Sequence, residues 1–324
     1  MIKPGSGAAP DSPALVTVII PAWNASATID ATLDSARRQT HDALEILVVD
    51  DGSTDDTVSI AMAHAGADPR IRILRQSNAG VAAARNHGIA QSRGAFIAPL
   101  DADDLWAPTK TERQLARFAA GGARTGLVYC GYAVIDEADI VLRVVLPQPE
   151  GDVRMALCEH NFVGNGSGAM FRREALVGTS GYEPALRAAD AQGCEDHLLY
   201  FRTALNWEFG VVKEPLLGYR MTRNSMSSDP FRMQRSHALC LAEFAADFPE
   251  GRTAMDRGQA RFSRWLLGKA IEFGPWAQMP LFLGQAARHG IPPLPRAIAS
   301  AFLRRWKARR LRRSTHPPRF PLPG

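Results

Sequence analysis

The chain has 324 residues, of which 46% are hydrophobic and 22% are charged, which is the composition of a folded protein with a sizeable core. It contains no apolar run of the roughly 18 to 20 residues that span a bilayer, and its N-terminus lacks the pattern of a signal peptide. The four cysteines form no CxxC pair, which disfavours a zinc site or a disulfide framework. We therefore expect reduced thiols and a cytoplasmic protein.

The net charge of +5 is unevenly distributed along the chain. Residues 273–324 contain ten Lys or Arg and no acid, so the rest of the chain carries a net charge of −5. Seven of the ten lie within 304–313, on a stretch (297–313) that also has an apolar stripe at helical spacing, formed by Ile298, Phe302 and Trp306. Such a helix can lie on an anionic membrane surface, here the inner face of the plasma membrane, or pack onto the body of the protein. It has no recognised nucleic-acid-binding motif, so we expect no nucleic-acid partner.

The first 105 residues show a regular alternation. Residues 1–13 are rich in Gly, Ala, Ser and Pro and are predicted to be a disordered leader. From residue 14 onward, short apolar runs alternate with segments of helical spacing. The predicted strands are 16–20, 45–49, 71–74 and 96–100, and the predicted helices are 26–38, a helix capped by Ser53 or Thr54, and 80–91. This order predicts a parallel sheet with helices on both faces.

After residue 105 the pattern is mixed. We predict a helix at 109–120, a hairpin formed by 127–135 and 141–146, a Gly-rich loop at 164–167, a helix at 195–205 and a strand at 207–212. Beyond about residue 230 the sequence is typical of helices interrupted by proline. The predicted organisation is one α/β domain at 14–228, followed by a helical extension at 229–324 that carries the basic amphipathic tail.

Polar clusters follow three of the predicted strands, at 21–24, 50–56 and 101–104. Ligands of such sheets bind beyond the carboxyl ends of the strands, so the three clusters predict one binding site. The last cluster has three acids within four residues, and carboxylates this close resist desolvation unless a cation joins them. A divalent cation, Mg²⁺ or Mn²⁺, shared with a phosphorylated ligand would stabilise such a cluster.

Five motifs in order resemble those of family 2 glycosyltransferases. They are VIIPAWN at 18–24, VVDDGSTD at 48–55, GVAAARN at 80–86, LDADD at 100–104 and ED at 195–196. The resemblance covers roughly residues 14–225. It implies the GT-A fold, a Rossmann-like α/β fold with a mostly parallel sheet flanked by helices, here with a C-terminal helical extension.

The same resemblance implies a function. Family 2 enzymes are inverting and move a sugar from a nucleotide-diphospho-sugar donor, here expected to be a UDP- or dTDP-sugar, with a divalent cation (Mn²⁺ or Mg²⁺) as cofactor. The expected acceptor is a hydroxyl of a carbohydrate or a lipid-linked acceptor in polysaccharide biosynthesis.

The resemblance also assigns roles to residues of the donor site. Pro21 and Trp23 would line the pocket for the base and ribose, with ordinary core packing as the alternative for Trp23. Asp51 would accept a hydrogen bond from the nucleotide base. Asp101 would contact the ribose, and Asp103 would bind the metal, because Asp101-x-Asp103 matches the DxD motif.

Other residues near this motif have open assignments. Arg85 could pair with a carboxylate, contact the diphosphate or hold Asp101 in place. Asp104 is expected in the donor-binding site, with the capping of a helix as the alternative. Arg220 and Arg223 are candidates for support, because Thr222 stands where the family often has a histidine.

The chemistry of the expected reaction requires a base. The acceptor hydroxyl must lose its proton as it attacks, and a carboxylate can take it. The family motif puts this base at Asp196, with Glu195 as a supporting neighbour. The alternative is that both acids only favour the N-terminus of a helix electrostatically.

Two other functions remain open. One is a catalytically inactive sugar-nucleotide-binding or membrane-scaffold protein of the same fold, which the Thr222 departure allows. The other is a nucleotidyl- or phosphotransferase, which is disfavoured because the chain has no GxxxxGK[ST] motif and no GxGxxG after its first strand.

Overall fold

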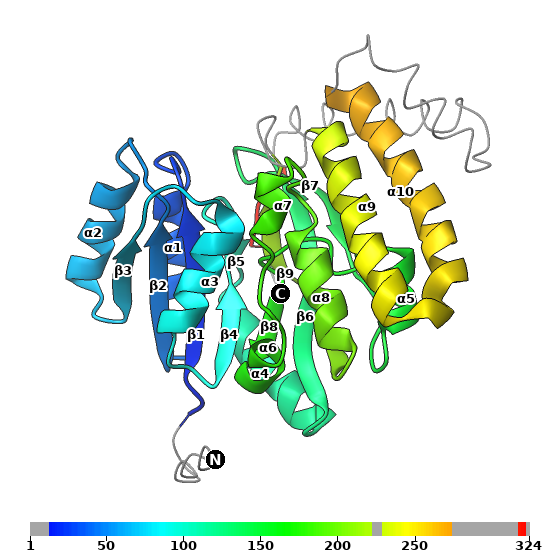
Figure 1. The fold of residues 1–324 in the computed structure, drawn as a ribbon. Helices are drawn as coiled ribbons and strands as arrows, with labels where there is room; N and C mark the ends of the chain where they lie inside the picture. Colours follow the sequence, from blue (N-terminus) through cyan, green and yellow to red (C-terminus); the bar gives the residue numbers. More distant parts are fainter. Residues whose placement is uncertain (1–12, 222–228, 274–316, 322–324) are drawn as a thin grey trace.

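The computed structural model describes residues 13–221, 229–273 and 317–321 (Figure 1). The predicted leader, apart from Pro13, lies outside these residues, as do the basic stretch 297–313 and Arg223. What the sequence predicts for those segments stays a prediction. Within the described part of the chain, no helix is long and apolar enough to cross a membrane.

Four strands form the parallel part of the sheet, which has nine strands among the described residues. They are β1 (Val16–Ala22), β2 (Leu44–Asp50), β3 (Ile71–Arg75) and β4 (Phe96–Pro99), in the spatial order β3-β2-β1-β4. All seven residues of β1 are buried, because β2 and β4 pair with it on either side. A central strand of this kind explains the unbroken apolar run in the sequence.

Helices cover both faces of this parallel part. The helices α1 (Ile29–Arg37) and α2 (Thr57–Ala67) pack on one face, and α3 (Val81–Gln91) packs on the other. Ile19 shares a core with Ala82 of α3, whereas Val18 and Ile20 share a core with Ile29 of α1. Successive side chains of β1 therefore serve two separate cores, as the pleat of a strand requires.

The remaining strands extend the sheet in mixed orientation. They are β5 (Leu105–Trp106), β6 (Thr125–Ile135), β7 (Val141–Val145), β8 (Ala169–Arg172) and β9 (Glu208–Arg220). The order continues as β4-β8-β6-β9-β5, with β7 paired to β6. β8 is antiparallel to both neighbours, but the long β6–β9 pairing is parallel, so most paired residues of the sheet lie in parallel pairings. The predicted α/β class with a mostly parallel sheet flanked by helices is confirmed.

The later helices surround the mixed part of the sheet (Figure 1). They are α4 (Lys110–Gly121), α5 (Arg154–Glu159), α6 (Arg173–Val177), α7 (Ala185–Ala188), α8 (Glu195–Ala204), α9 (Pro230–Asp247), the 3₁₀ turn η2 (Pro249–Gly251) and α10 (Arg252–Phe273). Asp229 caps α9 by accepting hydrogen bonds from the backbone of Phe231 and Arg232. Phe244 of α9 stacks on Phe201 of α8 with ring centroids 3.7 Å apart. The described part of the predicted helical extension therefore shares a core with the sheet.

Two local predictions were wrong. α2 begins at Thr57, so neither Ser53 nor Thr54 caps it; their polar groups bind the loop after β1 instead. The predicted strand 207–212 is longer and continues as β9 to Arg220, because an irregularity in its pairing with β6 accommodates the polar residues after Val212. The four cysteines are all buried and form no disulfide within the described residues.

Candidate active site

The loops after β1 and β2 are joined by hydrogen bonds. The Asn24 backbone N–H donates to Ser53 Oγ (3.0 Å), the Thr54 N–H donates to Asn24 Oδ1 (2.9 Å), and the Ser26 N–H donates to Asp55 Oδ2 (3.0 Å). Trp23 lies on the first of these loops and is 59% exposed, so core packing does not explain it. Its ring is available to a ligand at the carboxyl edge of the sheet.

Two other residues at this edge are buried. Pro21 lies within β1 and pairs in register with Val49. Asp51, which follows β2, is 4% exposed, and its carboxylate accepts hydrogen bonds from Gln76 Nε2 and from the backbone N–H groups of Ala79 and Gly80, each at 2.8 Å. Asp51 therefore fixes the loop that leads into α3, directly beside the exposed Trp23 loop.

The acidic loop after β4 is tied to the Gly-rich loop before β8. The Asp101 N–H donates to Ser167 Oγ (2.9 Å), and the Ser167 hydroxyl donates to Asp104 Oδ2 (2.5 Å). The other oxygen of Asp104 accepts the backbone N–H of Arg220 (2.8 Å). Ser167 thus connects the first and last acids of the motif.

Asp104 does not have the helix-capping role that was its predicted alternative. β5 follows it and α4 starts only at Lys110, so Asp104 caps no helix. It is also fully buried, and each carboxylate oxygen accepts one hydrogen bond from the protein; its contact with a donor stays a prediction. Burial and the adjacent carboxylates raise the pKa of Asp104 well above its usual value.

Asp103 is half-buried, as Asp101 is, and its carboxylate fits a cation ligand. Its backbone carbonyl accepts a hydrogen bond from Arg220 Nε (2.8 Å), but no other residue in the described ranges donates to its side-chain oxygens. Burial, with the nearby Asp101 carboxylate, raises the pKa of Asp103 to about 6. A hard cation would favour the ionised form and bind this carboxylate directly.

Arg220 fastens the acidic loop to the hairpin formed by β6 and β7. Its guanidinium is 5% exposed and donates to the carbonyls of Asp103 and Asp136 and to Asp139 Oδ1, at 2.8, 2.8 and 2.7 Å. All three nitrogens of the side chain are thus engaged within the protein. Arg220 therefore fixes the position of the acidic loop, and the supporting role in the donor site that the sequence predicts for it stays a prediction.

Arg85 joins the acidic loop to the start of α8. Its Nη2 donates to Asp101 Oδ1 (2.5 Å), and its Nη1 donates to Asp196 Oδ1 (2.9 Å). The guanidinium is 5% exposed and lies over the ring of Tyr182, 4.8 Å from its centroid. Although burial works against the charge, the two carboxylates raise the pKa of Arg85 above its usual value. Of the open assignments, pairing with carboxylates is the one observed.

Asp196 is partly accessible at the N-terminus of α8, with 21% of its side chain exposed. Burial raises the pKa of Asp196 to about 6, Arg85 opposes this shift, and Asp101 and Glu195 add to it. Glu195 points back to the preceding turn and accepts the backbone N–H of Gly193 (2.7 Å), and burial raises its pKa as well. Of the two acids, only Asp196 pairs with Arg85.

Close approach at this site requires Gly166. A Cβ on Gly166 would lie 2.7 Å from Arg85 Nη2 and 3.1 Å from each carboxylate oxygen of Asp196. The contact with Arg85 would force one partner to shift, and the contacts with Asp196 would be tighter than most real ones. The Gly-rich loop predicted before β8 therefore has a specific function: it leaves room for the ion pair.

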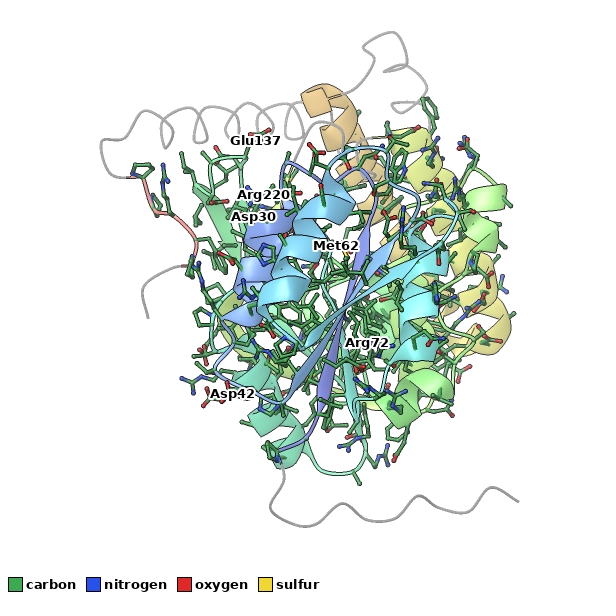
Figure 2. The ribbon with its side chains drawn as sticks, turned by 90° about the vertical axis from the view of Figure 1, so that its left-hand side faces the viewer. Asp30, Asp42, Met62, Arg72, Glu137 and Arg220 are labelled. Atoms are coloured by element: carbon green, nitrogen blue, oxygen red, sulfur yellow. The ribbon has the colours of Figure 1, made fainter. Side chains whose placement is uncertain are left out.

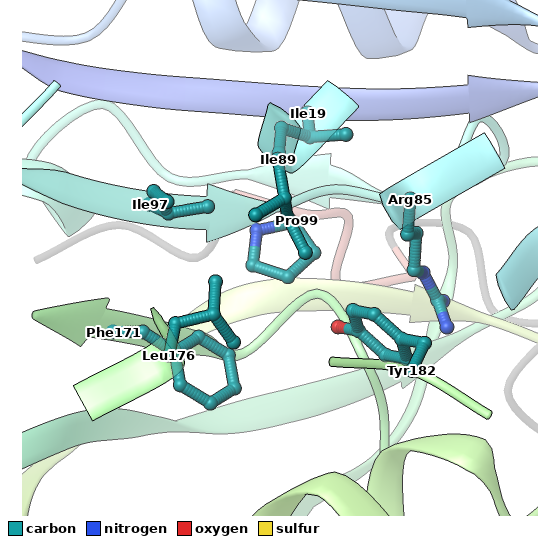
Figure 3. Close-up of a pocket in the computed structure, with 8 residues that line it drawn as sticks. All are labelled: Ile19, Arg85, Ile89, Ile97, Pro99, Phe171, Leu176 and Tyr182. Carbon is teal, nitrogen blue, oxygen red and sulfur yellow. The ribbon is translucent and has the colours of Figure 1, made fainter. Parts of the chain in front are cut away.

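Tyr182 was not predicted from the sequence. Asn86, adjacent to Arg85 on α3, holds both backbone polar groups of Tyr182 through its side-chain amide, at 2.8 and 2.9 Å. Figure 3 shows the Tyr182 ring beside the guanidinium of Arg85, with its hydroxyl directed into a narrow, largely apolar space too small for water. Neither the Tyr182 hydroxyl nor Arg85 Nε has a hydrogen-bond partner among the residues that the structure describes.

Comparison with known proteins identifies the class of this one. Residues 17–178 match the family model described as Glycosyl transferase family 2. The protein EpsH of Bacillus subtilis (strain 168) is 33% identical over 241 residues, which are 72% of this chain and 68% of EpsH. WfgD of Escherichia coli, named UDP-Glc:alpha-D-GlcNAc-diphosphoundecaprenol beta-1,3-glucosyltransferase, is 37% identical over 135 residues, which are 41% of this chain and 52% of WfgD.

Solved structures share the fold. TarS 1-349 of S. aureus superposes with a TM-score of 0.58 at 17% identity, over 91% of both chains. Mannosyltransferase PcManGT from Pyrobaculum calidifontis, in complex with GDP-Man and Mn²⁺, gives 0.58 at 18% identity, over 97% of this chain and 92% of that one. The fold, with its acidic loop at the carboxyl edge of the sheet, is that of a GT-A glycosyltransferase. The chain belongs to glycosyl transferase family 2 and is a glycosyltransferase of glycan biosynthesis.

Proposed function

We propose that this enzyme transfers a sugar from a nucleotide-diphospho-sugar to an acceptor hydroxyl with inversion at the anomeric carbon. The observation that carries the proposal is the pairing of Arg85 with both Asp101 and Asp196. This pairing brings the DxD loop and the start of α8 to one point at the carboxyl edge of the sheet. A donor held by the loop would then lie next to a carboxylate that can act as the base.

Asp196 is proposed as that base. With its pKa at about 6, the carboxylate is ionised at neutral pH and is a stronger base than an exposed aspartate. Arg85 stabilises the ionised form and, with its second nitrogen, fixes the position of Asp101. A proton taken from the acceptor hydroxyl would rest on the part of Asp196 that remains accessible. Direct displacement of the nucleoside diphosphate by this hydroxyl inverts the anomeric centre.

Asp103 is proposed to hold a divalent cation, Mn²⁺ or Mg²⁺. Among the residues that the structure describes, no three His, Cys, Asp or Glu side chains are grouped as ligands of a metal ion. A cation at Asp103 would therefore take its other ligands from the donor diphosphate and water, as Mg²⁺ commonly does. When bound, it would neutralise charge on the departing diphosphate. The Mn²⁺ in the complex of the structural neighbour PcManGT supports this proposal.

The proposed donor is a UDP- or dTDP-sugar, with Trp23 beside the base. Solved structures of TarS with UDP-GlcNAc and of PcManGT with GDP-Man support a nucleotide-sugar donor without selecting the base. Asp51 has one hydrogen bond on its second oxygen, which leaves that atom able to accept an imide N–H. For the acceptor we propose a carbohydrate or lipid-linked hydroxyl, as the name of WfgD supports, and an anionic membrane surface remains the proposed partner of residues 297–313.

A donor screen tests this proposal. The full chain is incubated with UDP-, dTDP- and GDP-sugars, an acceptor panel and Mn²⁺ or Mg²⁺, with and without a chelator. We expect turnover with a pyrimidine donor, its loss with the chelator, and a fall of at least about 100-fold in Asp103→Ala. Asp152→Ala, an exposed aspartate paired with Arg154, is the matched control and should keep its activity. Metal-dependent UDP binding without turnover would instead favour the catalytically inactive alternative.

A further inference from the structure

The segment 317–321 lies against the turn that joins β6 to β7. Two backbone hydrogen bonds, with N–O distances of 2.8 and 3.0 Å, and one antiparallel bridge hold it there, formed by the pairs Val141–Pro318, Asp139–Phe320 and Ile140–Arg319. Figure 2 draws the segment in pink beside this hairpin. The segment therefore provides hydrogen-bond partners for backbone groups at this turn that the pairing of β6 with β7 does not satisfy.

Phe320 anchors the segment. Its side chain is 6% exposed and belongs to the same core as Ile135 and Leu217. A Cβ on Gly218 of β9 would lie 2.8 Å from Phe320 Cδ1, so the ring occupies the space left by the missing side chain. Arg319, by contrast, is exposed, so its backbone contributes to the bridge while its side chain points away from the core.

The same turn holds Arg220. The carbonyl of Asp139 accepts the N–H of Phe320, and the Asp139 carboxylate accepts Arg220 Nη2 at 2.7 Å. Asp139 has a φ of 63°, a left-handed backbone conformation that is uncommon outside glycine but in which Asp and Asn are enriched. Arg220 in turn contacts the carbonyl of Asp103 and, through its backbone, the carboxylate of Asp104. Contacts thus run without a break from Phe320 to the DxD loop.

We propose that Phe320 is a positioning residue for the DxD loop. The segment fixes the turn at 136–139, the turn orients the Asp139 carboxylate, and that carboxylate keeps the buried Arg220 guanidinium on the carbonyl of Asp103. Without the segment, the guanidinium would lose its charged partner and the loop would lose an anchor. The effect on sugar transfer rests on the proposed function, but the effect on the loop does not.

Hydrogen exchange in the full-length, unliganded chain tests the proposed effect of Phe320 on the DxD loop. The reporters are the amides of Asp104, bonded to the carbonyl of Asp101, and Arg220, bonded to Asp104 Oδ1. In Phe320→Ala we expect both to exchange at least about tenfold faster, because local opening of the loop becomes easier. Arg319→Ala, which keeps the backbone bridge and the buried ring, is the matched control and should match the wild type. Unchanged exchange at both reporters in a folded Phe320→Ala protein would overturn the proposal.

If Phe320→Ala does not fold, a second variant tests the same proposal. Asp139→Asn keeps the anchor and a side chain that tolerates the left-handed backbone, but removes the charge facing Arg220. It should accelerate exchange at Asp104 and Arg220 as Phe320→Ala would, whereas protection equal to the wild type would contradict the proposal.

Kinetics test the proposed effect of Phe320 on sugar transfer. In Phe320→Ala the Mn²⁺ concentration for half-maximal rate should rise about tenfold, whereas Phe320→Leu, which keeps an apolar anchor, should recover most of the loss. In the double variant Phe320→Ala/Asp139→Asn, the Mn²⁺ concentration for half-maximal rate should be no higher than in the more impaired single variant. Both substitutions act on the same series of contacts. A wild type without turnover would refute the proposed function and leave exchange to decide this inference. Normal turnover and unchanged exchange in the variants would refute this inference alone.

Discussion

Asp196 lies 111 residues beyond Arg85 in the chain, yet the two side chains form an ion pair at 2.9 Å. The other terminal nitrogen of Arg85 holds Asp101, so one guanidinium fixes the first acid of the DxD motif and the proposed base. Two carboxylates facing one buried cation leave a net negative charge at the site. Burial is the main cause of the raised pKa of Asp196, and the Asp101 and Glu195 carboxylates add to it, so the pKa stays above its ordinary value although Arg85 opposes the shift.

Replacement of Arg85 by lysine tests this arrangement. A single ammonium group cannot reproduce the planar fork that reaches both carboxylates, so Arg85→Lys should lower kcat by about 100-fold. Arg113→Lys, which alters a weak, exposed ion pair with Glu214, is the control and should retain activity within about twofold. Steady-state kinetics at saturating donor and Mn²⁺ make the comparison. Equal kcat values in the two variants would show that the fork is dispensable.

The pH dependence of transfer should report Asp196. The base acts in its ionised form and its pKa is about 6, so kcat/KM should fall about tenfold for each pH unit below about 6. In Arg85→Ala the positive charge near Asp196 is lost, so this acidic limb of the profile should move to higher pH. In Arg85→Lys the limb should move to higher pH to the extent that the charge near Asp196 is weakened. The profile is measured at saturating Mn²⁺ so that metal loss does not mimic it. A limb near pH 4, the range of an ordinary aspartate, would contradict the assignment.

Gly166→Ala should disturb the ion pair directly. The new Cβ would press on Arg85 and on both oxygens of Asp196, so we expect kcat to fall at least about tenfold and the free energy of unfolding to fall by about 1–3 kcal/mol. Gly66→Ala, in a helix position with no atom within 4 Å of the added methyl group, is the matched control and should be neutral or slightly stabilising. Chemical denaturation and kinetics are compared for both. Full activity in Gly166→Ala would mean that the close approach is not needed.

Two histidines in the helical layer should make the fold sensitive to acid. His197 of α8 contacts the carbonyl of Leu157 (2.8 Å), and His237 of α9 stacks on Phe262 with centroids 3.9 Å apart. Burial lowers the pKa of His197 to about 4 and that of His237 to about 3, against 6.5 for the unfolded chain. Between pH 6.5 and about 4 the unfolded chain therefore binds more protons, and the free energy of unfolding decreases as the pH falls through this window.

The expected loss is about 1–2 kcal/mol per histidine between pH 6.5 and about 5. His237→Phe keeps a ring against Phe262 and should lose its share of this dependence. Urea denaturation at about pH 7, 6 and 5 provides the measurement. An identical decline with pH in the wild type and the variant would exclude His237 as a source of acid sensitivity.

Much of the fold follows from the sequence because its signals are local. The four parallel strands are apolar runs that end at polar clusters, and α3 covers almost the residues expected for it. The length of β9 was underestimated because Lys213, Glu214 and Pro215 interrupt its apolar pattern. The strand continues beyond these residues because it pairs with β6. The capping alternative for Asp104 was wrong because its neighbours suggest a turn, whereas its partners Ser167 and Arg220 are remote in the chain.

For the candidate site too, local sequence signals were predictive and contacts between remote segments were not. The sequence predicts which acids gather at the carboxyl edge, because strand ends in a parallel sheet meet there. It does not predict Tyr182 beneath Arg85, nor the path from Phe320 to Arg220, because each depends on contacts between segments that no local pattern connects. A signal for Ser167 existed in the Gly-rich loop, but the loop's contact with Asp101 and Asp104 appears only in the folded chain.

The role of Asp196 is tested most directly by the rate of sugar transfer in Asp196→Asn, at saturating donor and Mn²⁺, beside Asp152→Asn as an exposed control. The amide keeps the size of the side chain and cannot take a proton. We predict that kcat falls at least about 1,000-fold in Asp196→Asn with the donor KM within about threefold of the wild type, while Asp152→Asn is unaffected. A kcat within about threefold of the wild type in Asp196→Asn would show that another group is the base.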